Sequence, residues 1–321
     1  MSSRRQRADV TNMKSVYPEP PKQPPNGRSG VYRLSSGETD AWVLFDQIFW
    51  AEPIQQFALG VPDSTIAELM ERHFLPSNRL QLSSDTLLFR WAGETVLVDT
   101  GVGTQLAGSA GLLPQQLAAL DIRPEEISVV LMTHLHVDHI GGAFDPSSGL
   151  ATFPNAKFFV SEAEINFWSQ SPLDLGDVRE LPPEFIDLTV QCARRALSIL
   201  EKQIQAFKPE SEVLPGITAI ALPGHTPGQS GFLFKASAGQ FLAAADTMHD
   251  PILHVTHPEW TSVGDWSRRQ TEETRRKLLD VLARDRIRFH AFHFPFPGIG
   301  RVRAIADGAY EFVPERRWWD P

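Results

Sequence analysis

The chain has 321 residues, of which 42% are hydrophobic and 21% are charged, and its formal net charge is −9. This is an ordinary globular composition, and the acidic balance argues against a nucleic-acid partner, because such a partner needs a basic surface to neutralise its phosphates. No apolar run approaches the roughly 18 residues of a membrane-spanning helix, which argues against a membrane partner. Cys192 is the only cysteine, so intrachain disulfides and thiolate metal sites are excluded, and a reducing, cytoplasmic setting is expected. Any metal must therefore be held by nitrogen and oxygen atoms.

The beginning of the chain differs in composition from the rest. It contains "YPEPPKQPPNGRSG", which is too rich in proline and glycine for regular structure, so residues 1–30 are predicted to be an extended arm. Residues 31–321 then form a single predicted domain. Its first clear elements are apolar runs at 85–91 and 95–101 around "AGE", which predict a hairpin, and a β-branched run at 125–133, which predicts a buried strand.

The middle of the chain combines a further strand with two helices. The apolar run 156–160 is followed by Ser161 and Glu164, whose spacing predicts a capping box at the start of a helix. After the two prolines at 182–183, a long helical stretch is expected. The residues of its apolar face would be Ala193, Leu197, Leu200, Ile204 and Phe207.

Strands dominate again in the last third. Strand-like runs return between 216 and 247, an amphipathic helix is predicted over 271–285, and a last strand is predicted over 287–294. Strand-rich stretches are separated by helices in both halves. This order indicates an α/β protein in which sheets and helices form layers.

Three of the ten histidines lie together with an aspartate in the stretch "THLHVDHIGG". On a helix, His134 and His136 would point about 200° apart and could not share a metal ion, whereas on an extended segment residues two apart face the same side. If the chain then turns at the glycines 141–142, Asp138 and His139 can reach a second ion. The preceding buried strand would hold this cluster at its carboxyl end, where α/β proteins commonly place their sites.

Two ions need further ligands, and three later segments offer them. His225 lies in "LPGHTPGQS" between a strand and a turn, Asp246 ends the strand-like "LAAADT", and "HAFHFPFPGIG" contains both His290 and His293. His293 is favoured because it lies next to the turn, whereas His290 lies within the strand. The expected ligands are, for one ion, His134, His136 and His225; for the other ion, Asp138, His139 and His293; and, bridging the two, Asp246.

The same stretches resemble the metallo-β-lactamase-fold hydrolase superfamily. The resemblance rests on "LVDTGVG", "THLHVDHIGG", "LPGHTPGQS" and "AADT", and the ending "HFPFPGIGRVR" with "YEFVP" is similar to the branch that contains methyl parathion hydrolase and quorum-quenching lactonases. It implies an αββα sandwich, in which two mixed β-sheets are flanked by helices and a dinuclear site lies at one edge of the sheets. It also implies that Asp99 of "LVDTG" orients a ligand histidine.

A pair of divalent ions in this site predicts a metal-dependent hydrolase. Zinc is the first expectation for His and Asp donors, and iron, manganese and cobalt are compatible with them. The ions would lower the pKa of a bridging water from near 16 towards about 7, so that a hydroxide attacks an ester or lactone bond, such as that of an acyl-homoserine lactone. Asp138 and Asp246 are the expected catalytic carboxylates, and Asp246 would pass a proton to the leaving group.

The expected partner is therefore a small-molecule ester or lactone, and a homodimer is compatible with the sequence. Two alternatives stay open. A phosphotriester (organophosphate) hydrolase would use the same ions, and only substrate assays separate it. A thioester hydrolase acting on a glutathione thioester should show a basic patch that binds anions, and the sequence shows none.

The residues that would contact the substrate are aromatic or histidine. Acyl-homoserine lactonases often place a tyrosine beside the site, whereas Tyr17, Tyr32 and Tyr310 lie far from "AADT" in this sequence. His249 follows three residues after Asp246 and could line the pocket or donate a hydrogen bond to a leaving group. The aromatic candidates, for which core packing is the alternative, are Phe45, Phe49, Trp50, Phe167 and Trp168.

Overall fold

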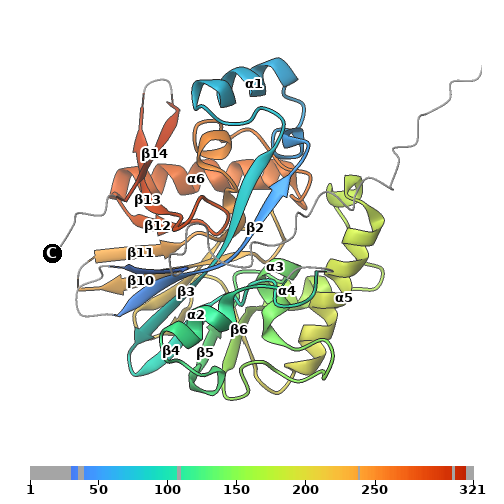
Figure 1. Ribbon diagram of the computed structural model, residues 1–321, viewed down its shortest axis with the longest axis vertical. Coiled ribbons are helices and arrows are strands. Elements are labelled where there is room, and N and C mark those ends of the chain that lie inside the picture. The colour runs from blue at the N-terminus through green and yellow to red at the C-terminus, as the bar shows by residue number, and fades with distance from the viewer. Residues whose placement is uncertain (1–29, 35–39, 107–109, 238, 306–307, 316–321) are drawn as a thin grey trace, which may run out of the picture.

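The structure is a computed structural model, and it describes residues 30–34, 40–106, 110–237, 239–305 and 308–315 (Figure 1). The predicted arm, except for Gly30, lies outside the described residues, as do Trp318 and Trp319. Within these ranges, none of the helices combines the length and the apolar character that crossing a membrane requires.

The N-terminal half forms a first sheet of seven strands. Their order is β1 (Val31–Leu34), β2 (Ala41–Ala51), β3 (Leu80–Trp91), β4 (Glu94–Val98), β5 (Val129–Leu131), β6 (Lys157–Ser161) and β7 (Ile204–Phe207). Strands β1 to β4 are antiparallel, and β4 to β7 are parallel. The hairpin expected around "AGE" is the β3–β4 pair, and the predicted strands of 125–133 and 156–160 are β5 and β6.

The C-terminal half forms a second sheet of seven strands. Their order is β14 (Tyr310–Pro314), β13 (Ile299–Ala304), β12 (Arg288–His290), β11 (Gly239–Ala243), β10 (Ser230–Ala236), β9 (Ile217–Ala221) and β8 (Glu212–Leu214). Among these pairs only β11 and β12 are parallel.

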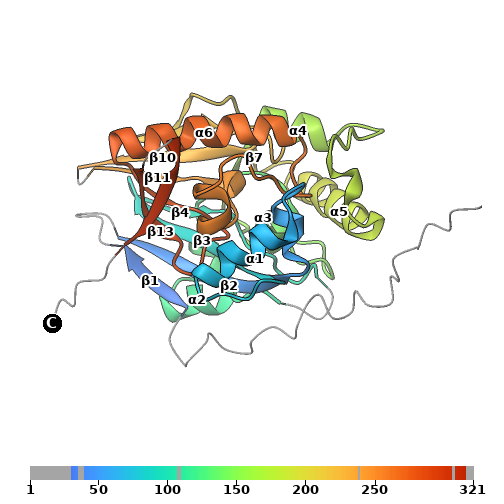
Figure 2. The same cartoon turned by 90° about the horizontal axis from the view of Figure 1, so that it is seen from above.

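The two sheets pack face to face between two layers of helices. Side chains alternate along β3, so that Leu87 and Phe89 lie between the sheets while Leu88 faces outwards. The outer face of the first sheet packs against α2 (Leu113–Ala119), α3 (Val137–Ile140), α4 (Glu162–Trp168) and α5 (Pro183–Ile199). The outer face of the second sheet packs against α6 (Arg268–Asp285). Figure 2 shows these layers in succession from α6 at the top, through β10 and β11, to β2, β3 and α2 below. The predicted αββα sandwich is confirmed.

The remaining elements are short and lie mostly around one edge of the sandwich. Helix α1 (Asp63–Arg72) packs with η3 against β3 and against the segment around Trp260. The short helices are η3 (Ile54–Phe57), η4 (Pro124–Glu126), η5 (Gly141–Ala143), η6 (Val178–Glu180), η7 (Ala245–Thr247) and the π-helical turn η8 (Pro251–Val255).

Three predicted elements are shorter than expected. The predicted strand over 125–133 is a strand only at β5, and η4 occupies Pro124–Glu126 before it. Helix α5 ends at Ile199, and Ile204 and Phe207 belong instead to β7, because pairing with β6 overrides the helical spacing of the apolar residues. The predicted strand over 287–294 is a strand only at β12, and the chain turns after His290.

The predicted capping box at α4 is half right. Ser161 caps the helix, because its hydroxyl accepts a hydrogen bond from the backbone N–H of Ala163. Glu164, however, does not reach back to the start of the helix. Its carboxylate turns into the interior and binds other segments instead.

Candidate metal centre

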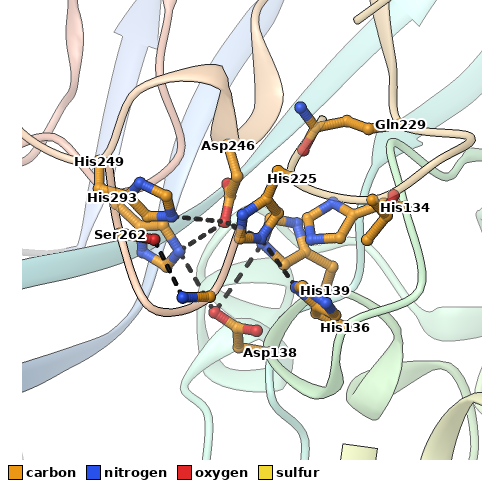
Figure 3. A network of polar contacts seen from close by, with 12 residues as sticks. His134, His136, Asp138, His139, His225, Gln229, Asp246, His249, Ser262 and His293 are labelled. Atoms are coloured by element: carbon orange, nitrogen blue, oxygen red, sulfur yellow. Dashed lines mark hydrogen bonds and ion pairs between the residues drawn. The ribbon is translucent and has the colours of Figure 1, made fainter. Parts of the chain in front are cut away.

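The carboxyl ends of four strands meet at one edge of the two sheets. β4 leads to Asp99, β5 to His134, β11 to Asp246 and β12 to His293. β4 and β5 are parallel neighbours, as are β11 and β12, so the ends of each pair lie side by side. Figure 3 shows the side chains from both sheets facing one another across this edge.

His134, His136 and His225 form a first group, whose ligand nitrogen atoms all lie within 4.8 Å of one another. His136 has an extended backbone, with φ −65° and ψ 155°, so that it faces the same side as His134, as the alternation predicts. Its Nδ1 lies 2.8 Å from Nε2 of His225. The loop after β9 therefore brings a distant histidine to the local pair.

Asp138, His139 and His293 form a second group within the same distance limit. The backbone changes from extended to helical at α3, directly after His136, and this change redirects Asp138 and His139. The Nε2 of His293 lies 3.4 Å from Oδ2 of Asp138, and that of His139 lies 3.8 Å from the same oxygen. Gly142 allows the close packing behind them, because a Cβ there would lie 2.0 Å from the carbonyl oxygen of Thr100.

Asp246 lies between the two groups. Its Oδ2 is 3.6 Å from Nε2 of His225 in the first group. The same oxygen is 3.3 Å from Nε2 of His139 and 2.8 Å from Nε2 of His293 in the second group. One carboxylate oxygen is thus placed to be shared by two cations.

Several buried atoms at the centre of the cluster favour a cation. Nε2 of His134, Nε2 of His139 and Oδ1 of Asp246 have no hydrogen-bond partner among the described residues. Buried polar atoms are normally paired. His134, His139 and Asp246 form a further cluster across the two groups, with their ligand atoms within 4.8 Å of one another, so these unpaired atoms fit metal coordination. The donors are imidazole and carboxylate groups only, which suits zinc and other divalent transition metals.

The protonation of the first group also suits a metal. Burial and the nearby imidazole of His139 lower the pKa of His134 well below its ordinary value. Burial and the imidazole of His225 do the same for His136. Neutral imidazole is the form that binds a metal ion.

The carboxylates of Asp138 and Asp246 lie close to the rings of the second group. Burial raises the pKa of Asp246, but His293 and His139 outweigh burial and hold the pKa of this carboxyl well below its ordinary value. Burial lowers the pKa of His139, but Asp246 and Asp138 outweigh it and raise that pKa overall. The carboxylates thus stabilise positive charge at this end of the site, and a divalent cation supplies such charge.

Hydrogen bonds behind the rings fix their orientation. Nδ1 of His139 donates to Oδ2 of Asp99 at 2.9 Å, the contact that the sequence resemblance implied. Nδ1 of His293 donates to the carbonyl oxygen of Ser83 at 2.8 Å. In both rings Nε2 is therefore left free to face the centre of the site.

Asp265 plays the corresponding part for His225. Its Oδ1 lies 3.1 Å from Nδ1 of that ring, and it is fully buried. The sequence reasoning missed Asp265, which lies 40 residues after His225 in "VGDWS". No motif marks it, because its role depends on how the 247–266 segment folds back over the site.

A cavity of about 580 Å³ opens from the cluster. His136, Asp138 and His293 lie at its polar end, and the walls are mainly apolar. Five of the predicted substrate contacts line it, namely Phe49, Trp50, Phe167, Trp168 and His249. The cavity thus joins the candidate metal site to an apolar chamber beside α4 and α5.

Phe45 does not line this cavity. A β-bulge at Asp46 adds one residue to β2 between Phe45 and Gln47, which reverses the alternation of the strand. Phe45 and Phe49 would share a face in a regular strand, but the ring of Phe45 packs edge-on to Phe296 instead. The expectation that Phe45 contacts substrate was wrong for this reason.

His249 lies against the candidate metal site. Its Nε2 is 3.8 Å from Oδ2 of Asp246, and its ring stacks on that of His293 with centroids 5.3 Å apart. Its backbone N–H donates to Nδ1 of His254, which is buried. His257 instead stacks on Trp260, away from the cluster. Of the three histidines in this segment, only His249 lines the cavity.

His290 is separate from the cluster. It lies within β12, and its ring belongs to neither group of ligand atoms. Burial lowers its pKa to about 3, so it is a neutral core residue. His293, three residues later in the turn, is the histidine that reaches the site, as its position next to the turn suggested.

Comparisons with known proteins agree with this architecture. The family model of the Metallo-beta-lactamase superfamily matches residues 80–288. An N-acyl homoserine lactonase of a Bacillus species is 24% identical over 174 residues, which are 48% of this chain and 59% of that protein. The chain thus spans somewhat more than half the length of this relative.

Two solved structures share the fold over almost their whole length. AidC, a dizinc quorum-quenching lactonase, has a TM-score of 0.84 and 24% identity, and covers 90% of this chain and 99% of its own. The hydrolase AbOPH has a TM-score of 0.81 and 25% identity, and covers 91% and 99%. With the family model spanning most of the chain and the two-sheet architecture in place, the protein belongs to the metallo-β-lactamase superfamily.

Proposed function

We propose that the protein is a dinuclear metal-dependent hydrolase that cleaves an ester or lactone bond in a small molecule with an apolar substituent. The observation that carries this proposal is the position of Asp246, whose Oδ2 lies within 3.6 Å of imidazole nitrogens from both ligand groups at the end of an apolar cavity. The lactonases among the similar proteins support the same reaction class.

The two ligand groups would hold one ion each. The first ion would be bound by His134, His136 and His225, and the second by Asp138, His139 and His293, with Asp246 shared. Zinc is the first candidate for these donors, with iron, manganese and cobalt as alternatives. Such a pair lowers the pKa of a bound water to about 7 and polarises a substrate carbonyl oxygen.

The carboxylates of Asp246 and Asp138 would accept and donate the proton of this reaction. Asp246 is 2% exposed, and its Oδ1 has no described hydrogen-bond partner, so it is placed to accept a proton inside the cluster. The side chain of Asp138 is 19% exposed and lines the cavity. We therefore assign the acceptance of the proton to Asp246. Asp138 can also donate a proton to the leaving group, alongside the donation expected from Asp246.

His249 would orient the substrate. Burial lowers its pKa well below the ordinary value, so the ring is neutral and carries one N–H. A neutral imidazole beside the cluster can donate a hydrogen bond to a carbonyl or leaving-group oxygen without repelling a cation. This role corresponds to the one that a tyrosine would otherwise fill.

The cavity favours a neutral substrate. Its described lining contains Glu52 and Glu180 and no lysine or arginine. A thioester of an anionic carrier is therefore disfavoured, because no lysine or arginine of the described lining would pair with its charge. Apolar acyl and aryl groups fit the walls.

The test is a hydrolase panel on metal-free and zinc-loaded protein, with acyl lactones, aryl esters, thioesters and phosphotriesters. We expect zinc-dependent turnover of lactones or esters, and its loss in Asp246→Asn. Asp250→Asn is the matched control, because Asp250 is a nearby buried carboxylate that caps η8 and belongs to neither ligand group. Turnover that survives chelation, or zinc-loaded protein that cleaves neither esters nor lactones, would refute the proposal. Faster cleavage of phosphotriesters would favour that alternative.

A further inference from the structure

Glu164 is a buried carboxylate that no step of the proposed reaction uses. It lies in the first turn of α4, is 0% exposed, and accepts four hydrogen bonds. Oε2 accepts from the backbone N–H of Leu135 at 3.2 Å and from Nε1 of Trp168 at 2.6 Å. Oε1 accepts from the hydroxyl of Thr226 and from the backbone N–H of Gly228 at 3.1 Å.

Three of the four partners of this carboxylate come from the two loops of the first ligand group. Leu135 lies between His134 and His136, so its N–H fixes the extended segment from which both rings project. Thr226 directly follows His225. One carboxylate therefore ties together two loops that are 89 residues apart, measured between His136 and His225.

The remaining contacts tighten this arrangement. Gly228 approaches the start of α4 so closely that a Cβ there would lie 2.2 Å from the backbone nitrogen of Glu164. The ring of Trp168 packs edge-on to that of His136, with centroids 5.7 Å apart, and it also lines the cavity. Glu164 thus connects the cavity wall to the first ligand group.

We propose that Glu164 is a positioning residue that assembles the His134–His136–His225 group, and that it acts on this group and not on the Asp138–His139–His293 group. The inference rests on the proposed function, because it assigns a task to Glu164 within that dinuclear site. The separation between the groups follows from their supports. His139 is oriented by Asp99 and His293 by the carbonyl of Ser83, and neither contact involves Glu164.

The chemistry of the contacts requires a carboxylate at this position. Two N–H donors meet at Oε2, and an N–H and a hydroxyl meet at Oε1. An amide in its place would direct an NH₂ group towards at least one buried backbone N–H, leaving that N–H unpaired. Glu164→Gln therefore keeps the shape of the side chain and removes its function as a fourfold acceptor.

The experiment uses the full chain as wild type, Glu164→Gln and Asp99→Asn. Zinc affinity is measured for both sites by competition with a chromophoric chelator, and zinc per chain by elemental analysis. X-ray absorption at the zinc edge then counts the imidazole ligands of the ion that each variant retains. Asp99→Asn is the matched comparison, because Asp99 binds the ring of His139 directly and reaches the first group only through the hydroxyl of Thr133, which lies 3.1 Å from Nδ1 of His134.

We expect Glu164→Gln to lower the binding affinity for one of the two zinc ions by about 10- to 100-fold. The ion that it retains should show two imidazole ligands, from His139 and His293. Asp99→Asn should retain the other ion, with three imidazole ligands. A generally destabilised protein would show no such reciprocal pattern.

The inference would be overturned if wild type binds two zinc ions and Glu164→Gln either keeps both at wild-type affinity or loses both equally. The proposed function would still stand in that case. Wild-type protein that binds fewer than two ions would overturn the proposed function. If Glu164→Gln does not fold, Thr226→Val removes one of the four donors with little change in shape. Thr226→Val should lower the affinity for the same zinc ion by a smaller factor. An unchanged zinc affinity in Thr226→Val would also overturn the inference.

Discussion

His139 donates a hydrogen bond from Nδ1 to Oδ2 of Asp99 across 2.9 Å, and both side chains are fully buried. The same oxygen accepts from the hydroxyl of Thr133, while Oδ1 accepts from the backbone N–H of that residue. Every donor around Asp99 thus points at a carboxylate oxygen. The ring of His139 is held with Nε2 facing Asp246.

We predict that Asp99→Asn lowers kcat/KM by about 10- to 100-fold, because an amide cannot accept from all three donors and the ligand ring loses its fixed orientation. Steady-state kinetics on the zinc-loaded protein measure this. Asp145→Asn is the control, since Asp145 makes the same kind of hydrogen bonds in an exposed turn with Ser147 and Ser148. Equal activity of the two variants would contradict the prediction.

We predict that His249→Phe lowers kcat by about 100-fold while the zinc content stays at two ions per chain. The reason is that the ring would lose its N–H beside the reacting bond but is not one of the seven proposed ligands. Kinetics and elemental analysis are measured on the same preparation. His257→Phe is the control, because its ring stacks on Trp260 outside the cavity. A loss of zinc in His249→Phe would show instead that this histidine binds metal.

We predict that kcat/KM rises with the length of an apolar substituent until the cavity is filled. Each buried CH₂ contributes about 0.8 kcal/mol, which is roughly a fourfold increase. Ile186→Phe should remove the gain for long substituents and leave short ones unaffected, because Ile186 lines the wall on α5 and lies outside the ligand groups. The measurement is kcat/KM of wild type and this variant for substrates of increasing chain length. If kcat/KM rises equally with chain length in both proteins, the cavity is not the binding site.

We predict a pH-dependent stability contribution from Asp250. Burial raises the pKa of this carboxyl from 3.8 to about 6, so the folded protein holds the proton more tightly than the unfolded chain between these values. The contribution is therefore fully present below about pH 4 and is lost as the pH rises through 6. Its size is up to about 3 kcal/mol, at 1.36 kcal/mol per pH unit.

Urea unfolding of metal-free wild type and Asp250→Asn measures this difference. Asparagine keeps the cap that Asp250 provides to Ile252 and Leu253 but does not ionise. The free energy of unfolding of the variant minus that of wild type should therefore increase as the pH rises from 4 to 7. A difference that does not change with pH would contradict the prediction.

Much of the fold and of the candidate site can be predicted from local patterns. The alternation in "HLHVDH" places His134 and His136 on one side of an extended segment, although the backbone changes direction at Val137 and not at the glycines 141–142. Asp246 and His293 were placed by the rule that α/β sites lie at the carboxyl ends of strands. These inferences hold because the period of side chains along a strand is a property of the backbone and needs no knowledge of distant segments.

Other features depend on contacts that no local pattern encodes. The spacing of Ser161 and Glu164 indicates a capping box, yet Glu164 binds two loops whose approach is set by the packing of both sheets. Asp265 reaches His225 because an irregular segment folds over the site, and a single bulge at Asp46 moves Phe45 out of the cavity. The chain's own periodicity settles which way side chains face within an element. Which elements meet depends on how the two sheets bury their apolar faces, and that follows from the sum of many weak contacts spread over the whole chain.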